Sequence, residues 1–198
     1  MTLLEKIRAK KLQSEAPAPP VETIVEPKPE PKLKMTALEA LKVFGHDSFR
    51  PGQEEVINAV VEGSGGVLAV FPTGFGKSLV YQLPSLMSDD LTVVVSPLIA
   101  LMKDQVDKLQ SLGVNAIFIN STLSDRDATI ALAEVASGGI TALYVSPERF
   151  RNKQFVSAMK NVEIGMLAID EAHCISRWGH DFRPAYSDLG GVVEMRKR

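Results

Sequence analysis

The sequence has little of what marks a secreted or membrane-embedded protein. It holds a single cysteine, Cys174, in 198 residues, so it offers neither a disulfide framework nor a cysteine-based zinc site. The first 13 residues are charged throughout and lack the apolar core of a secretory signal. No apolar run is long enough to span a bilayer. We therefore expect no membrane partner and a reducing compartment, either the cytoplasm of a bacterium or the nucleus of a eukaryote.

An excess of charge of either sign is also missing. Lysine and arginine number 22, aspartate and glutamate 24, which gives a net charge of −2. A broad basic field of the kind that draws a whole domain to nucleic acid is therefore excluded. If this chain binds nucleic acid, it does so through a local patch. The apolar fraction of 45% is typical of a globular domain.

Residues 14–34 alternate proline with charged residues. Proline removes backbone donors and disfavours helix in the residue before it, and few apolar groups remain to offset the entropy of ordering. The sequence thus predicts a disordered tail over 1–34, of unknown partner, followed by a domain over 35–198. Residues 1–12 could form a short frayed helix, but we interpret them as a solvated tail.

From residue 35 onward the pattern is that of alternating helices and strands. Thr36 can cap a helix that Gly45 ends, and Pro51 can start a second helix. Short apolar runs predict strands at 67–71, 91–95, 116–119, 141–145 and 166–169. Helical patterns follow at 77–87, 98–112, 124–136 and 153–160. This order predicts an α/β fold, with a mostly parallel sheet covered by helices on both faces.

Residues 73–78 read Thr-Gly-Phe-Gly-Lys-Ser and link a predicted strand to a predicted helix. Gly74 and Gly76 can adopt backbone angles that turn amide N–H groups toward phosphate oxygens. Lys77 would reach the outer phosphates, and Ser78 would bind Mg²⁺. The strict motif asks for a glycine where Phe71 stands, so a plain glycine-rich turn followed by a surface lysine is the alternative.

Two adjacent carboxylates, Asp170 and Glu171, end the last predicted strand. Asp170 fits as a partner of Mg²⁺, which prefers oxygen ligands and is held by few protein groups plus phosphates. Glu171 would then orient or deprotonate the attacking water. His173 could relay between phosphate and a bound polymer, or hydrogen-bond within its own loop. The alternative is a pair of solvated acids at a strand end.

The segment after the carboxylates is rich in aromatic and basic residues. Trp178 and Phe182 offer flat faces on which nucleic-acid bases can stack, and Arg183 offers charge. Local packing is the competing interpretation. Cys174 has no evident base partner, so we interpret it as a small buried residue and not as a nucleophile.

Taken together, these motifs resemble the RecQ family of DNA helicases over about residues 41–190. The similarity includes 41–57, which resembles the family's adenine-recognition motif, and the phosphate loop with 79–84, where the family also lacks the first glycine. It continues through 95–106, 143–149 and the Asp-Glu-Ala-His box at 170–173. Residues 174–184 are similar to the family's aromatic-rich loop, which couples single-stranded DNA binding to ATP hydrolysis.

The resemblance implies the first RecA-like, P-loop domain of a 3′-to-5′ DNA helicase acting in recombination and repair on single-stranded and forked DNA, with ATP and Mg²⁺ as cofactors. Its catalytic residues would be Lys77, Asp170, Glu171 and His173. Nucleotide would be bound by Arg50, Gln53, Thr73, Gly74, Gly76, Lys77 and Ser78. DNA would be bound by Ser96, Pro97, Trp178, Phe182 and Arg183. Mg²⁺ would be held by Ser78 and Asp170.

The family motor also needs a second RecA-like domain, which supplies an arginine finger and which residues 1–198 do not include. We therefore expect a nucleotide-binding half-motor that binds ATP weakly, hydrolyses it slowly and does not unwind alone. The family often has tyrosine at His46, a small residue at Phe75 and glutamine at Arg177, so these three positions depart from it. Two rivals stay open: an RNA-directed ATPase of the DEAD-box kind, and a nucleotide-binding adaptor or truncated product without helicase activity.

Overall fold

A computed structural model describes residues 34–63, 65–175 and 183–189. The predicted tail lies outside the described residues, apart from Lys34, and so do Trp178 and Phe182. No helix within the described ranges is both long and apolar enough to cross a bilayer.

The core of the fold is a four-stranded sheet in which every neighbouring pair is parallel. Its strands are β1 (Leu91–Val95), β2 (Ala116–Ile119), β3 (Ala142–Val145) and β4 (Ile164–Ile169), in the spatial order β2-β3-β1-β4. Val95 pairs with Val145 and with Ile169, and Val145 pairs with Ile119. The four strands therefore end level with one another. The predicted parallel α/β fold is confirmed.

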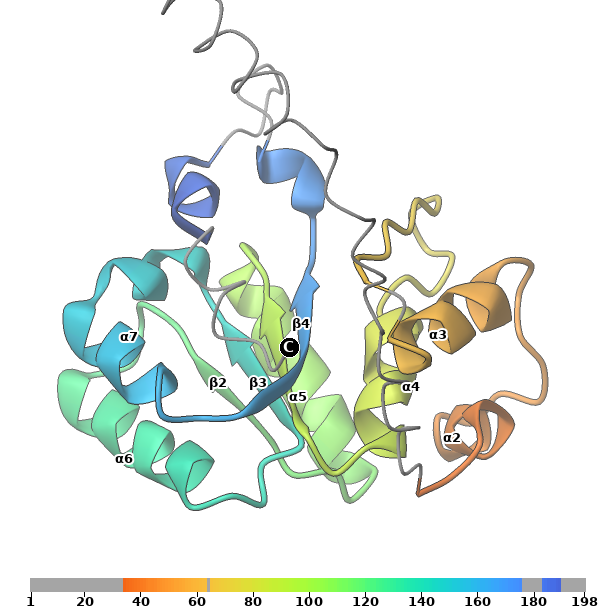
Figure 1. The fold of residues 1–198 in the computed structure, drawn as a ribbon, viewed down its shortest axis with the longest axis horizontal. Coiled ribbons are helices and arrows are strands. Elements are labelled where there is room, and N and C mark those ends of the chain that lie inside the picture. The colour runs from red at the N-terminus through yellow and green to blue at the C-terminus, as the bar shows by residue number, and fades with distance from the viewer. Residues whose placement is uncertain (1–33, 64, 176–182, 190–198) are drawn as a thin grey trace, which may run out of the picture. The chain divides into compact units, whose positions relative to one another are not determined.

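Helices cover both faces of this sheet (Figure 1). Successive side chains of a strand point to opposite faces. Val94 and Tyr144 accordingly pack with the group α2 (Ala37–Val43), α3 (Gln53–Val61), α4 (Leu79–Met87) and α5 (Ile99–Ser111). Val93, Val95 and Leu143 pack instead with α6 (Asp125–Ala136) and α7 (Lys153–Met159). Two apolar cores result, one on each side of the sheet.

Local sequence explains where the helices begin. Thr36 caps α2 through a reciprocal capping box with Glu39, as its position predicted. Ser124 and Asn152 cap α6 and α7 with their side-chain oxygens. α3 begins two residues after Pro51. Three short 3₁₀ helices were not predicted: η1 (Pro147–Arg151), η2 (Ala172–Ile175) and η3 (Pro184–Leu189).

The predicted strand at 67–71 is wrong in this structure. The segment has no regular secondary structure, and the side chains of Leu68 and Val70 are 81% and 84% exposed. A strand requires a neighbour for its backbone N–H and C=O groups, and the sheet ends at β4 without pairing to this segment. Apolar composition predicted burial here, but composition alone does not provide a pairing partner.

Candidate nucleotide site

Each of the four strands is followed directly by a polar residue. These residues are Ser96 after β1, Asn120 after β2, Ser146 after β3 and Asp170 after β4. Because the strands end level, the four side chains form a row at the carboxyl edge of the sheet, where ligands bind in folds of this kind. Ser146 is fully buried, and its hydroxyl has no hydrogen-bond partner among the described residues. Neither Asn120 nor Ser146 was among the predicted site residues.

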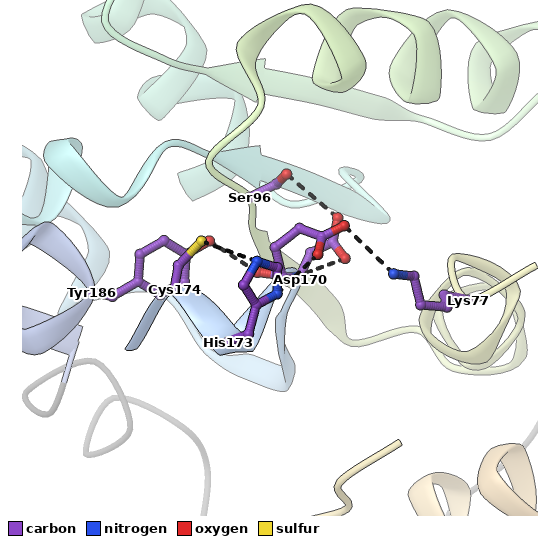
Figure 2. Close-up of polar contacts among 7 residues, drawn as sticks. Lys77, Ser96, Asp170, His173, Cys174 and Tyr186 are labelled. Atoms are coloured by element: carbon purple, nitrogen blue, oxygen red, sulfur yellow. Dashed lines mark hydrogen bonds and ion pairs between the residues drawn. The ribbon is translucent and has the colours of Figure 1, made fainter. Parts of the chain in front are cut away.

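Asp170 is held in place from several directions (Figure 2). Its backbone N–H donates to the Val95 carbonyl at 2.8 Å, and its carbonyl accepts a bond from the Tyr186 hydroxyl at 2.9 Å. Its carboxylate accepts from the Ser96 hydroxyl at 3.5 Å and from the Glu171 N–H at 3.0 Å. Burial, followed by the negative charge of Glu171, raises the pKa of Asp170, against the lowering effects of the Glu171 N–H, Lys77 and Ser96.

Glu171 stands at the centre of the charged groups. Its Oε1 lies 3.6 Å from the Lys77 ammonium, and its Oε2 lies 3.2 Å from Nδ1 of His173. Its backbone has a φ of 49°, and among the described residues it is the one non-glycine residue with a positive φ. That conformation costs an L-residue roughly 1–2 kcal/mol. The strain lies at the position for which the sequence predicted the catalytic base, as is common at functional sites.

The phosphate loop lies between an exposed segment and the start of α4. Gly74 and Gly76 have φ values of 76° and 83°, which confirms the predicted need for glycine at both positions. Thr73 is exposed, and the Ser78 side chain forms no capping bond at the helix start. Lys77 reaches from this loop toward the end of β4 (Figure 2). The loop and the carboxylates, far apart in sequence, are thus brought together.

The two residues expected to contact adenine hold the phosphate loop in this structure. Arg50 donates from Nη1 to the Gly74 carbonyl at 2.8 Å. Gln53, 2% exposed, donates from Nε2 to the carbonyls of Phe75 and Gly76 at 3.1 and 3.3 Å. The Gln53 carbonyl oxygen accepts from the Arg50 N–H at 2.8 Å. Both ends of the Gln53 amide are therefore engaged inside the chain.

Phe75, at a position where the RecQ family often has a small residue, takes part in a stack. Its ring lies 5.6 Å from that of Phe71, with an angle of 14° between the planes. The Arg50 guanidinium lies 5.4 Å from the centre of the Phe75 ring, within cation–π range. The stack adds apolar and electrostatic contacts to a loop that is otherwise held by hydrogen bonds from side chains to its backbone carbonyls.

Three of the five residues predicted to bind DNA are described. Ser96 and Pro97 follow β1, and Ser96 is 3% exposed. Arg183 donates from Nη1 to the Pro97 carbonyl at 3.0 Å, and its N–H donates to the Cys174 carbonyl at 3.1 Å. The structure therefore brings Arg183 next to Pro97. Cys174 is buried, as predicted.

The side chains present fit a magnesium ion that arrives with its nucleotide. No group of three or more His, Cys, Asp or Glu residues suited to a metal occurs in the described part of the chain, so an all-protein cage is absent there. Mg²⁺ in phosphate-transfer sites needs only one or two carboxylates, and the phosphates complete its coordination. Asp170, with a carboxylate at the sheet edge, and Ser78 suit that limited role.

Two relationships missed by the sequence analysis involve tyrosines. Tyr186 in η3 fixes the backbone of Asp170 through its hydroxyl. Tyr144, in β3, accepts a hydrogen bond from the buried Gln82 of α4 at 3.0 Å. Gln82 and Tyr144 lie in segments that resemble family motifs, but the sequence does not indicate either contact, because both join residues that only the packing of the elements brings together.

Comparison with known proteins connects this geometry to a family. The model of the DEAD/DEAH box helicases matches residues 50–197. The ATP-dependent DNA helicase RecQ of Haemophilus influenzae is 52% identical over 160 residues, which are 80% of this chain and 26% of that protein. RecQ of Bacillus subtilis is 46% identical over 74% of this chain and 25% of its own length. The chain thus spans about a quarter of these relatives.

Solved structures agree at the level of the fold. The helicase MrfA, bound to DNA and AMPPNP, superimposes with a TM-score of 0.55 at 23% identity, over 73% of this chain and 22% of its own. The Lhr helicase of Mycobacterium smegmatis, bound to single-stranded DNA and AMP-PNP, gives 0.55 at 17% identity, over 71% and 20%. These matches confirm the RecA-like fold. With its motifs in the expected places, the chain belongs to the DEAD/DEAH box helicase family and, within it, to the RecQ group.

Proposed function

We propose that this chain forms the ATP-binding half of a RecQ-type, 3′-to-5′ DNA helicase that acts in recombination and repair. The observation that supports this most is the meeting of Lys77 with Glu171 at 3.6 Å, directly beside Asp170. A phosphate-loop lysine and a pair of carboxylates at one sheet edge form the minimal set for nucleoside triphosphate hydrolysis. The curated relatives are named ATP-dependent DNA helicases.

Each residue then has a task in phosphoryl transfer. Lys77 leaves Glu171 and pairs with the outer phosphates, which carry more negative charge than one carboxylate. Glu171, released from the lysine, accepts a hydrogen bond from the attacking water and orients it. Asp170 and Ser78 would hold Mg²⁺, which supplies charge neutralisation of the phosphates when it is bound. His173, 3.2 Å from Glu171, positions that carboxylate.

The DNA side of the proposal concerns the same carboxyl edge of the sheet. Ser96 and Pro97 are buried in this structure, so they would shape the loop beside which DNA binds, and Arg183 would add charge beside them. Trp178 and Phe182, outside the described residues, would stack on bases of single-stranded DNA. Unwinding of forked DNA would further require a second RecA-like domain that provides an arginine finger, so this half is proposed to bind Mg-ATP and single-stranded DNA without unwinding by itself.

The test is nucleotide binding by the chain and by Lys77→Ala, with Lys160→Ala as a matched control, since Lys160 is an exposed lysine at the end of α7. Mg-ATP should raise the unfolding temperature of the chain and of Lys160→Ala, because a ligand bound only to the native state stabilises it. Lys77→Ala should show little shift. Equal shifts in all three proteins would refute the phosphate-loop assignment.

The same proteins separate the rival functions. An adaptor without nucleotide chemistry should show no thermal shift at millimolar Mg-ATP. An RNA-directed ATPase should be stimulated by single-stranded RNA more than by single-stranded DNA of the same base composition. The proposed function requires the opposite preference.

A further inference from the structure

A small polar network lies inside the apolar core that packs against α4 and α5. Gln82 of α4 is 3% exposed. Its Nε2 donates to Oε1 of the half-buried Gln105 on α5 and, at 3.0 Å, to the hydroxyl of Tyr144 on β3. The Ser85 hydroxyl donates to the Gln82 carbonyl at 2.6 Å. One amide therefore ties together two helices and the central sheet.

The two helices joined by this amide begin at the two halves of the proposed site. α4 follows the phosphate loop directly, and the Gln82 N–H donates to the Ser78 carbonyl at 2.9 Å. α5 follows Ser96 and Pro97, and its first turn closes on Leu98. Each glutamine lies only one to two turns from the loop that precedes its helix. A shift of either loop is thus carried by a rigid helix to the shared hydrogen bond.

We propose that Gln82 and Gln105 are positioning residues that couple nucleotide binding at the phosphate loop to DNA binding at the start of α5. The inference rests on the proposed function and adds a route of communication to it. Phosphate binding separates Lys77 from Glu171 and reorders the loop at the start of α4. Apolar side chains around the network tolerate sliding, whereas a buried donor with a defined acceptor resists it, because losing the bond leaves the amide unpaired.

A second contact supports the direction of this route. The Arg183 guanidinium donates to the Pro97 carbonyl at 3.0 Å, and Tyr186, three residues later, fixes the Asp170 carbonyl. The start of α5 is therefore linked to the carboxylate side of the site as well. A displacement of α5 would therefore affect both the phosphate loop and the carboxylates. The coupling can then run from DNA to nucleotide as well as from nucleotide to DNA.

The experiment measures the affinity of the 198-residue chain for a fluorescent single-stranded DNA oligonucleotide, with and without Mg-AMPPNP. Gln105→Leu removes the acceptor for Gln82 at a half-buried position, whereas Gln105→Glu keeps an acceptor oxygen there. Gln110→Leu is the matched control, because Gln110 lies on the same helix and instead donates to the Ala116 carbonyl at 2.8 Å. Tyr144→Phe removes the second acceptor of the same amide.

We expect nucleotide to change the DNA affinity of the wild type by about tenfold, within the usual range for coupled sites. Gln105→Leu should reduce this ratio to less than about twofold, with nucleotide affinity in the absence of DNA unchanged. Gln105→Glu and Gln110→Leu should keep the ratio, and Tyr144→Phe should lower it in part. A purely structural role would lower the unfolding temperature of Gln105→Leu without changing the ratio.

Two results would overturn the inference while leaving the proposed function standing. One is a wild type that binds both ligands without influence on each other. The other is a native Gln105→Leu variant that keeps the full ratio, or, if that variant does not fold, a Tyr144→Phe variant that keeps it. A wild type that binds neither ligand would refute the proposed function and the inference with it.

Discussion

The two halves of the nucleotide site are built in different ways. Asp170 follows a strand of the sheet, and its backbone is fixed by the Val95 carbonyl and by the Tyr186 hydroxyl. The phosphate loop instead follows a segment without regular structure, in which Leu68 and Val70 are largely exposed. The carboxylates directly follow a strand of the central sheet, whereas the loop follows no strand and depends on side-chain contacts.

What holds the loop is a pair of side chains, Arg50 and Gln53, which bind the loop's carbonyls at Gly74, Phe75 and Gly76. The half of the site that would orient water and metal is therefore the rigid one. The half that must admit phosphates is held by side-chain hydrogen bonds that can break and re-form, and we call it the exchangeable half. Local stability of this uneven kind is expected where a ligand has to enter.

The largest effect should follow from changing the rigid half without disturbing its shape. Glu171→Gln preserves size but cannot accept a proton, so we expect ATP hydrolysis to fall at least 100-fold, in keeping with the typical contribution of a general base. Binding of Mg-ATP should stay close to that of the wild type. Phosphate release during steady-state turnover measures the first quantity and thermal shift the second.

Glu134→Gln, at an exposed position on α6, serves as the matched control for this change. If Glu171→Gln turned over ATP as fast as Glu134→Gln, the assignment of Glu171 to the attacking water would be wrong, and the strained φ at this residue would need another explanation.

In the exchangeable half, an alanine at Gly76 should disturb the phosphate loop, whereas an alanine at Gly74 should disturb it less. A Cβ at Gly76 would lie 2.9 Å from Nε2 of Gln53, whereas a Cβ at Gly74 would meet nothing within 4 Å. Both positions have positive φ, so both alanine variants bear a similar backbone strain. We expect Gly76→Ala to bind a fluorescent ATP analogue about tenfold more weakly than Gly74→Ala. Equal affinities would show that the contact with Gln53 does not shape the loop.

The same contrast explains what the sequence could predict. Continuous apolar runs predict the strands β1 to β4, and helical periodicity predicts the helices between them. The role of the carboxylates at the end of β4 follows from the rule that ligands bind at strand ends. The segment 67–71 has the same apolar character but pairs with no strand of the sheet. A single sequence does not show which segments will pair. The strand was therefore predicted where the structure has none.

Contacts between residues distant in sequence were likewise beyond prediction. The family resemblance placed Gln53 at the adenine, but its amide is engaged within the chain, with Nε2 donating to the loop and the side-chain oxygen accepting from the Arg50 N–H. Tyr186 lies in no segment named for the chemistry of the site, and Gln82 lies in the motif at 79–84 without any sign of its partners. Their roles are recognised only once the packing of α4 and η3 against the sheet shows which side chains meet.

A smaller effect should come from loosening the rigid half by a single hydrogen bond. Tyr186→Phe removes the hydroxyl that donates to the Asp170 carbonyl at 2.9 Å and leaves the buried ring in place. A net loss of about 1 kcal/mol in the free energy of unfolding is expected, the usual worth of such a bond. Urea denaturation measures it. An unchanged free energy would mean that water replaces the hydroxyl and that Asp170 is fixed by the sheet alone.

The smallest effect concerns the pH dependence of stability, and it has an unusual sign for a carboxylate. Burial and the charge of Glu171 raise the pKa of Asp170 above its ordinary value of 3.8. As the pH rises above that value, the unfolded chain therefore releases this proton before the folded one, and the carboxylate costs stability. Asp170→Asn should consequently gain stability relative to the wild type between about pH 3 and pH 7, and the two should be alike at the acid end.

Thermal unfolding of both proteins across that range measures the difference. Mg-ATP should reverse it at pH 7, because a divalent cation beside Asp170 favours the charged carboxylate, and the wild type alone would gain from it. If the two proteins had parallel profiles, the carboxylate would be as well solvated as the exposed acids of the surface. The rigid half of the site would then have been built without cost to stability, and its contrast with the phosphate loop would be one of geometry alone.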